Sequence, residues 1–416
     1  MEQKHVLSNG VRVLMEEIPH VRSASVGFWI DTGSKNETPE INGISHFIEH
    51  MLFKGTHTRS ALEIARTLED KGGALNAFTD KEQTCFYARV LDTEVALAID
   101  LLSDMVLHPA LDPAELKRER QVVLEEIKMY EDTPDELVQD LFNLVFFKDH
   151  PLGMPIAGTR TTMRGVSRQD VLDYLDRFYT PDRIVVAIAG RFDPSAVLDQ
   201  LERTIGRLER PATRLIEVPP VPQSAIKVKY KDIEQAHVCL GTEGVAISNP
   251  DRYVVTILDA VLGGGMSSRL FQEVREKRGM AYSISSYEIM YENAGVFGVY
   301  AGCSPKHLDE VIRLSLEELD KAKGGDITED ELQRTKDQLK GGMLLSLETP
   351  RNRMSRMARN ELSFGRLITP EEILTEIDRV TVADLTRVAR QIFDTKTLTA
   401  TVVGPTRKLK LPGLVA

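Results

Sequence analysis

Apolar residues recur at helical spacing between positions 43 and 53. The spacing i, i+3, i+4, i+7, i+8 predicts an amphipathic helix with one buried stripe. The stripe consists of Ile44, Phe47, Ile48, Met51 and Leu52. Such a helix packs one face and leaves its polar residues on another.

The pattern of strands and helix starts in the first half resembles that in the second half. Alternating residues that begin at Val11 resemble those that begin at Ile226, an offset of 226 − 11 = 215. The helix start at 111–116 resembles 327–332, with 332 − 116 = 216, and each places an N-cap residue three before a glutamate. Segments 166–171 and 380–385, and the strands that end at Gly190 and Gly404, are both offset by 214, from 380 − 166 and 404 − 190.

These repeats predict an α+β fold of two tandem homologous domains, each a mostly antiparallel sheet with helices packed on one face. Four prolines between Glu209 and Gln223 predict an extended linker. We therefore expect domains at 1–210 and 225–416, joined by a linker at 211–224. Two domains also suit 416 residues, because a single core rarely exceeds about 300.

Composition excludes several functional classes. A net charge of −11 and a pI near 5.5 argue against nucleic acid as a partner. No run approaches the roughly 18 apolar residues of a membrane span, so no membrane partner is expected. Cys85, Cys239 and Cys303 are few and far apart, and no signal peptide precedes the first strand. We therefore expect a cytoplasmic protein.

The polar face of the predicted helix carries candidate metal ligands. His46 and His50 lie within about 40° of each other on a helix, so both rings can reach one ion. Two imidazoles suit zinc, whose catalytic sites take a third protein ligand and keep one position for water. Glu49 lies beside them as a candidate base, in the inverted order H-x-x-E-H. The alternative is a pair of surface histidines that bind nothing.

A second helix, which begins at Asp112, offers the third ligand. Glu119 and Glu126 are seven residues apart and share one face at the border of the core, whereas Glu125 points about 100° away. We expect Glu126 to bind the metal and Glu119 to orient a histidine or the bound water. Geometry alone leaves open a surface acidic stripe that pairs with neighbouring lysines and arginines.

The offset places 260–266 opposite the metal helix, and this stretch has neither histidine nor carboxylate. We therefore expect one zinc ion per chain and a different role for the second domain.

Residues 46–56 and 119–126 together resemble the inverzincin peptidases, which include insulinase, pitrilysin and the mitochondrial processing peptidase. The separation 126 − 50 = 76 is similar to the ligand spacing of that family. The resemblance implies that His46, His50 and Glu126 hold zinc, that Glu49 is the general base and that Glu119 is a supporting catalytic carboxylate.

The same resemblance implies substrate contacts in both domains. Residues 73–79, with Asn76, Ala77 and Thr79, are similar to an edge strand that pairs with an extended peptide, although a plain hairpin strand is the alternative. In the second, inactive domain a glycine-rich segment at 263–270 precedes Arg275 and Tyr282, which would contact substrate backbone and the oxyanion. The chain length implies a chamber closed by paired subunits, as a homodimer or as a heterodimer with a paralogue.

The sequence thus predicts a zinc-dependent endopeptidase that hydrolyses peptides or unfolded segments within such a chamber. One alternative is a noncatalytic assembly subunit of the same fold. Another is a metal hydrolase with a non-peptide substrate. The glycines alone are a weak signal for a phosphate loop, because the Lys-Ser/Thr ending is missing.

Overall fold

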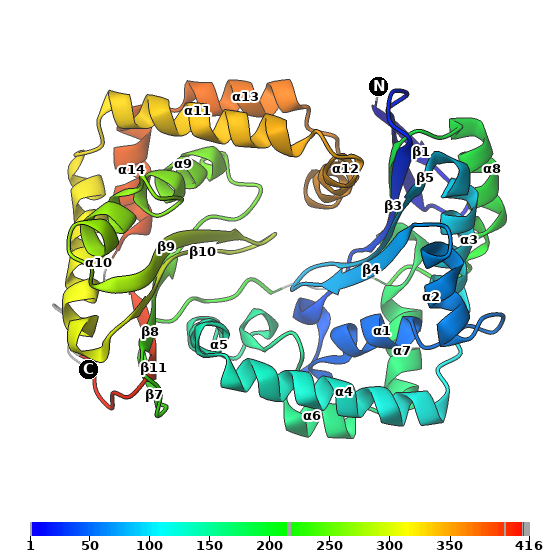
Figure 1. The fold of residues 1–416 in the computed structure, drawn as a ribbon, viewed down its shortest axis with the longest axis horizontal. Helices are drawn as coiled ribbons and strands as arrows, with labels where there is room; N and C mark the ends of the chain where they lie inside the picture. Colours follow the sequence, from blue (N-terminus) through cyan, green and yellow to red (C-terminus); the bar gives the residue numbers. More distant parts are fainter. Residues whose placement is uncertain (1, 214–217, 395–396, 410, 412–416) are drawn as a thin grey trace. The chain divides into compact units, whose positions relative to one another are not determined.

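The computed structural model describes residues 2–213, 218–394, 397–409 and 411, which form two compact units (Figure 1). Unit 1 comprises Met1–Lys128, Met154–Glu217 and Ser346–Ile368. Unit 2 comprises Met129–Gly153, Val218–Leu345 and Thr369–Ala416. Each unit therefore includes a segment from the other half of the sequence. The described part of the predicted linker, 211–213 and 218–224, forms no helix or strand.

Each unit is built on one sheet, and the two sheets have the same strand order. The first runs β1-β2-β6-β3-β5-β4 and the second β7-β11-β8-β10-β9, so only β1 lacks a counterpart among the described strands. One pair in each sheet is parallel, β2 with β6 and β7 with β11, and the other pairs are antiparallel. The strands are β1 (Glu2–Val6), β2 (Arg12–Glu17), β3 (Ser23–Ile30), β4 (Ala74–Thr79), β5 (Thr84–Leu91), β6 (Ile184–Gly190), β7 (Ile226–Tyr230), β8 (Ala236–Glu243), β9 (Ala281–Met290), β10 (Gly295–Cys303) and β11 (Thr399–Gly404).

Most helices of unit 1 pack on one face of the first sheet, and one helix packs on the other (Figure 1). On the more heavily covered side lie α1 (Ile44–Leu52), α2 (Ala61–Glu69), α3 (Val95–Leu107), α7 (Arg168–Phe178) and α8 (Pro194–Arg203), followed outward by α4 (Pro113–Asp132) and α6 (Arg160–Gly165). The opposite face carries α12 (Pro350–Phe364), whose Met354 and Met357 pack on Trp29 and Val185.

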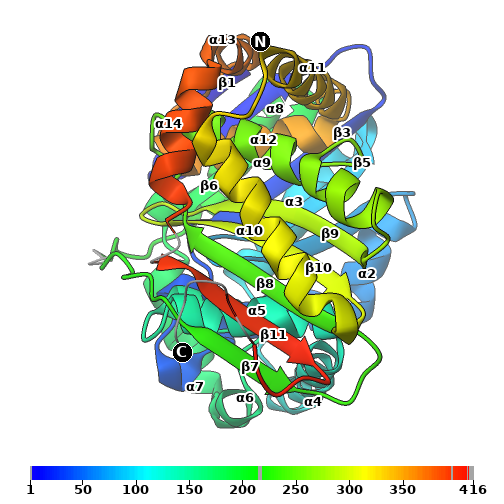
Figure 2. The same ribbon diagram turned by 90° about the vertical axis from the view of Figure 1, so that its left-hand side faces the viewer.

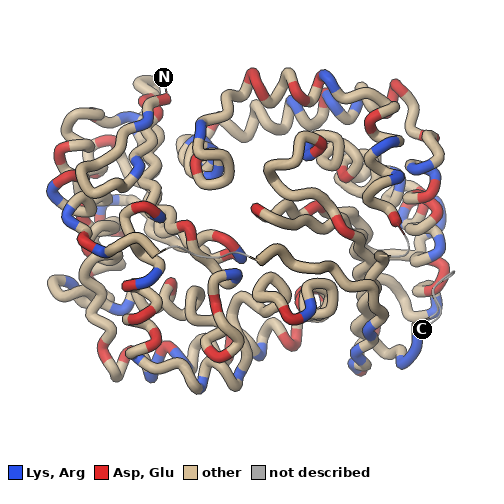
Figure 3. The backbone as a smooth tube through the Cα atoms, turned by 180° about the vertical axis from the view of Figure 1, so that it is seen from behind, with Lys and Arg blue, Asp and Glu red and all other residues tan. Residues whose placement is uncertain are grey.

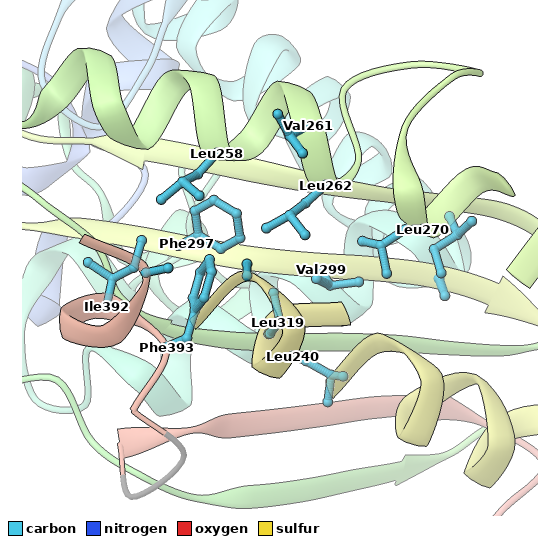
Figure 4. Packing of buried hydrophobic residues seen from close by; sticks show 14 of the residues in the cluster. Leu240, Leu258, Val261, Leu262, Leu270, Phe297, Val299, Leu319, Ile392 and Phe393 are labelled. Atoms are coloured by element: carbon cyan, nitrogen blue, oxygen red, sulfur yellow. The ribbon is translucent and has the colours of Figure 1, made fainter. Parts of the chain in front are cut away.

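Unit 2 repeats this arrangement around its own core. The helices α9 (Arg252–Leu262), α10 (Leu308–Gly324), α11 (Glu329–Ser346), α13 (Pro370–Arg379) and α14 (Val382–Ile392) lie on one side of β8–β10 (Figure 2). Their core includes Phe297 on the sheet and Phe393 after α14, whose rings meet edge to face at 4.8 Å (Figure 4). The other face carries α5 (Pro134–Phe146), which packs on Cys239 and Val403. The predicted α+β fold with two related sheets is confirmed, with the addition that each sheet has one helix on its second face.

The helices α5 and α12 are equivalent in sequence but are exchanged between the units. Each begins with a proline after a threonine N-cap, at Thr133-Pro134 and at Thr349-Pro350, with an offset of 350 − 134 = 216. The helix from the first half packs on the second sheet, and the helix from the second half packs on the first.

Charges of both signs are distributed over both units (Figure 3). None of the helices in the described part of the chain combines the length and apolar character that a membrane crossing requires.

Candidate metal centre

The helix α1 is fixed at its start by a buried carboxylate. Its N-cap is Gly43, at φ +97°, where a Cβ would lie 2.6 Å from the carbonyl oxygen of Ala157. A glycine has no side chain to cap the helix, so Glu37 takes this role from six residues earlier. Glu37 accepts from the backbone amides of Gly43 at 2.7 Å and Ser45 at 2.8 Å, and from Asn42 Nδ2 at 2.8 Å.

The Glu37 carboxylate is only 3% exposed, and burial raises its pKa to about 7 despite the hydrogen bonds it accepts. A second buried contact holds the same turn, because the hydroxyls of Ser45 and Tyr174 lie 2.8 Å apart. The position of α1 is therefore set by polar contacts at its start and by its buried stripe, whose five predicted residues are all buried.

His46, His50 and Glu126 lie together at the exposed side of α1. One ligand atom from each can be chosen so that all three lie within 4.8 Å of one another. Glu126 Oε2 lies 3.8 Å from His46 Nε2 and 3.5 Å from His50 Nε2. Among the described residues this is the one group of three His, Cys, Asp or Glu side chains with such geometry.

Glu119 holds His50 in the orientation that metal binding needs. Its Oε1 lies 2.9 Å from His50 Nδ1, and its Oε2 lies 2.8 Å from Lys54 Nζ. Because a carboxylate accepts, His50 donates its Nδ1 proton and keeps the Nε2 lone pair for a ligand. Although burial alone would raise the pKa of Glu119, its bonds to His50 and Lys54 hold the pKa below the usual value.

Glu49 is half-buried beside the two histidines. Burial raises the pKa of Glu49 above its ordinary value, Thr79 on β4 acts to lower its pKa, and the neighbouring Glu126 adds to the increase. Burial also lowers the pKa of His46 to about 4, with the electrostatic effect of His50 as a second cause. His46 is therefore a neutral imidazole at neutral pH, the form that binds metal.

The residues fit a divalent ion. Within the described structure, the buried atoms His46 Nδ1, Glu49 Oε2 and Glu126 Oε2 have no hydrogen-bond partner. Buried polar atoms without partners are rare and often mark an ion or a reacting group. Two neutral imidazoles and one carboxylate are also a common donor set for catalytic zinc.

The strand β4 lies at an open edge of the first sheet, next to this cluster. Asn76, Ala77 and Thr79 all belong to it. The side chain of Asn76 accepts from the backbone amide of Ala77 at 2.8 Å. An added strand would have to displace this contact.

Arg275 and Tyr282 lie in unit 2 and contact each other. The Arg275 guanidinium stacks 4.8 Å from the ring centroid of Phe271 and 5.7 Å from that of Tyr282. Arg275 belongs to a π-helical turn, Phe271–Glu276, a rare conformation that is frequent at functional sites. The Tyr282 side chain is 75% exposed.

The strand registers correct the predicted equivalence of 260–266 with the metal helix. The row Val186, Phe28, Phe86, Ala77 in the first sheet matches the row Ala400, Leu240, Val299, Ser286 in the second. The offset therefore falls from 400 − 186 = 214 to 286 − 77 = 209. The structural counterpart of α1 is α9, which ends at Leu262 and includes the carboxylate Asp259.

Two contributors to the site have only weak signals in the sequence. Glu37 precedes the helix by six residues, and a glycine N-cap without a capping side chain was the signal that could have found it. Lys54 lies two residues beyond the end of α1, so helical spacing does not place it beside His50. Its pairing with Glu119 depends on the approach of α4, which sequence spacing does not give.

Together, the fold and the cluster define a class: duplicated α+β proteins with a candidate mononuclear metal site at the edge of one sheet. Residues 12–160 match the domain family described as "Insulinase (Peptidase family M16)", and residues 165–339 match "Peptidase M16 inactive domain". The "uncharacterized zinc protease YmxG" of Bacillus subtilis (strain 168) is 44% identical over 393 residues, which cover 94% of this chain and 96% of that protein.

Solved structures show the same fold. A protease from Helicobacter pylori superposes with a TM-score of 0.90 at 24% identity, covering 97% of this chain and 99% of that one. A chain of "Complex III2 from Candida albicans, Inz-5 bound" superposes with a TM-score of 0.85 at 23% identity, covering 97% and 96%. The chain described here belongs to the insulinase family, peptidase family M16.

Proposed function

We propose that this protein is a zinc-dependent endopeptidase. One observation carries the proposal: the ligand atoms of His46, His50 and Glu126 gather within 4.8 Å, with the half-buried carboxylate Glu49 beside them. Several relatives are named zinc proteases, and these names support zinc as the metal. We propose one ion per chain.

The ion would be held by His46, His50 and Glu126, and when bound it would acidify a water molecule and polarise the peptide carbonyl. Glu49 accepts the proton of the attacking water and later delivers it to the leaving amine. Burial raises its pKa, which favours the step in which Glu49 holds and returns the proton. Glu119 keeps His50 oriented, and Thr79 interacts with Glu49.

The open edge of β4 would position the substrate. An extended peptide can add to a free sheet edge through backbone hydrogen bonds, and the contact of β4 with α1 brings such a peptide close to Glu49. Asn76, Ala77 and Thr79 would form this strand pairing, with the Ala77 amide released from Asn76.

Arg275 and Tyr282 would bind substrate backbone and the oxyanion in the assembled enzyme. We propose a homodimer, or a heterodimer with a paralogue, in which subunit pairing closes a chamber around peptides or unfolded segments. Sharing of the site between subunits is testable by mixing a Glu49→Gln chain with a Tyr282→Phe chain. Partial recovery of activity supports sharing, and no recovery rejects it.

The proposed compartment is the cytoplasm. Cys85, Cys239 and Cys303 are buried and unpaired, which suits a reducing environment. Fractionation of cells that express the full chain from its own gene measures this directly.

The function is tested by cleavage of an internally quenched peptide by the zinc-loaded protein. We expect cleavage that a chelator removes and added zinc restores. Glu126→Gln should lose zinc and activity together. Glu125→Gln is the matched control, because Glu125 is exposed and, among the described residues, forms an ion pair only with Lys128, at 3.3 Å.

The alternatives predict other outcomes. A zinc-loaded protein that cleaves no peptide in a diverse mixture would contradict the proposal. That result would favour a noncatalytic assembly subunit, a role consistent with the fold shared with a chain of "Complex III2 from Candida albicans, Inz-5 bound". Chelator-sensitive hydrolysis of esters without peptide cleavage would favour a non-peptide substrate.

A further inference from the structure

Two exposed arginines lie over the α12 face of the first sheet, close to its open edge. The guanidinium of Arg351 lies 4.7 Å from the ring centroid of Tyr87, and that of Arg359 lies 5.9 Å from the ring centroid of Trp29. Each arginine stacks on an aromatic ring. Asp80 partly offsets the charge of Arg359, which acts to lower the pKa of that carboxyl group, whereas the described residues include no ion-pair partner of Arg351.

The strand register places these charges near the edge where a peptide would add. Tyr87 is paired with Asn76 of β4, so the two side chains share the α12 face. Trp29 is paired with Cys85, and Cys85 with Phe78 of β4. Because Cys85 is small, the rings of Trp29 and Phe78 meet edge to face at 5.3 Å. The result is an aromatic floor, formed by Trp29, Phe78 and Tyr87, with two cations above it.

Two acidic groups on this side have contacts of their own. Glu16 pairs with Arg353, the residue two positions after Arg351. Asp80 is half-buried after the end of β4, accepts from the backbone amides of Glu82 and Gln83, and interacts electrostatically with Arg359. Arg351 therefore supplies most of the local positive charge over the floor, in a chain whose formal net charge is −11.

We propose that Arg351, assisted by Arg359, selects acidic side chains in a peptide bound along β4. The inference rests on the proposed function, and it names a substrate class: extended segments with Asp or Glu at alternate positions. In an added strand, every second side chain faces the α1 side and its metal cluster, and the others face the aromatic floor. The added strand lies about 10 Å, two strand spacings, from the Tyr87 column. An arginine and a glutamate side chain together span this gap.

The test is a charge scan along one quenched peptide with a single cleaved bond. Glu, Gln or Lys is placed in turn at each of eight consecutive positions, and kcat/KM is measured at low and high salt. We expect Glu to exceed Gln roughly two- to fivefold at alternate positions only, and Lys to fall below Gln at the same positions. The effect should shrink at high salt because exposed charges are screened.

Variants of Arg351 assign the preference to this residue. Arg351→Gln should remove most of the Glu preference, and Arg351→Glu should reverse it in favour of Lys. Arg203→Glu is the matched control, since Arg203 is an exposed arginine at the end of α8, which packs on α3 away from this face. Thermal melting of each variant verifies folding.

Cleavage without a two-residue period, or an unchanged Glu preference in folded Arg351→Glu, overturns the inference and leaves the proposed function standing. A zinc-loaded wild-type protein that cleaves none of the peptides overturns both.

Discussion

Each unit has one place where a helix packs on the edge strand of the sheet, which we call the corner of that unit. The two corners have the same helix-on-strand arrangement and different polar residues. In unit 1, α1 packs on the edge strand β4, and in unit 2, α9 packs on the edge strand β9. Alignment of the helix ends, 262 − 52 = 210, places Thr256 opposite His46, Asp259 opposite Glu49 and Ala260 opposite His50. The third ligand is also missing, since the offset of 216 between α4 and α11 places Gly342 opposite Glu126.

The polar residues of the second corner bond to each other across the helix and strand. Asp259 accepts from the hydroxyl of Ser286, and Glu288 accepts from that of Thr256, at 2.5 and 2.7 Å. Buried side-chain oxygens without a hydrogen-bond partner occur in both corners, at Glu49 and Glu126 in the first and at Glu288 in the second. Such atoms therefore do not separate the two corners. What separates them is the set of donors, because among the described residues only the first corner brings two imidazoles and a carboxylate within 4.8 Å of one another.

The largest expected effect comes from neutralising the equivalent carboxylates Glu49 and Asp259. Glu49→Gln should lower kcat by about 100- to 10,000-fold, because it removes the general base. Zinc should stay bound, since the three ligands are intact. Asp259→Asn should change kcat by less than about twofold. Peptide cleavage and zinc content of the purified variants measure both effects.

A fully active Glu49→Gln protein with normal zinc content would contradict the assigned base. A large loss in folded Asp259→Asn would show that the second corner takes part in the chemistry.

The second-largest expected effect is a loss of zinc affinity when Glu119, the carboxylate bonded to His50, is removed. Glu119→Ala leaves His50 Nδ1 without its acceptor, so we expect zinc affinity to fall about 10- to 100-fold. The equivalent position in α11 is Thr335, from 119 + 216 = 335, and Thr335→Ala should leave zinc affinity unchanged. Competition with a chromogenic chelator measures both. Equal zinc affinity in wild type and Glu119→Ala would contradict the proposal that Glu119 orients His50 for metal binding.

Periodicity and capping signals gave the helices that matter most for the site. The stripe from Ile44 to Leu52 and the Asp112-Pro113 start of α4 depend on local physics, so the sequence predicted both helices. The shared helix face of Glu119 and Glu126 made them candidates for the site, but spacing alone left a surface acidic stripe as the alternative, and the family resemblance favoured the metal site. The alternation at Val11 likewise predicted β2.

Other features depend on contacts that local spacing does not encode. Thr133-Pro134 and Thr349-Pro350 each signal a helix start, but nothing in either segment says which sheet the helix covers, and the two are exchanged. The constant offset failed at α9 because the chain from β7 to β9 is four residues shorter than the chain from β2 to β4, with 286 − 226 = 60 against 77 − 13 = 64. Strand pairing, not spacing, revealed Asp259.

A third effect is on stability, at the start of α1. Glu37→Gln keeps the size of the side chain but turns an amide NH₂ toward backbone donors that the carboxylate accepted. We expect the free energy of unfolding to fall by about 1–3 kcal/mol at pH 8, where Glu37 is ionised. Urea denaturation measures it. An unchanged midpoint would show that Glu37 does not fix the helix.

The smallest expected effect is a gain in the free energy of unfolding, from Glu288→Gln. Like Glu37, Glu288 has a pKa raised to about 7. Burial is the main cause, and Asp259 adds to it. Both states are protonated well below pH 4.5. Between pH 4.5 and 7 the unfolded state ionises while the folded state stays protonated, so this contribution to stability is lost as the pH rises.

Glu288→Gln keeps the acceptor for Thr256 without the charge. It should therefore match wild type at pH 4.5 and be more stable by about 1–2 kcal/mol at pH 8. Paired urea titrations at both pH values measure the difference, in which other titrating groups cancel. An equal difference at the two pH values would mean that Glu288 does not titrate between them, and the contrast with Glu37 would then reduce to hydrogen bonding alone.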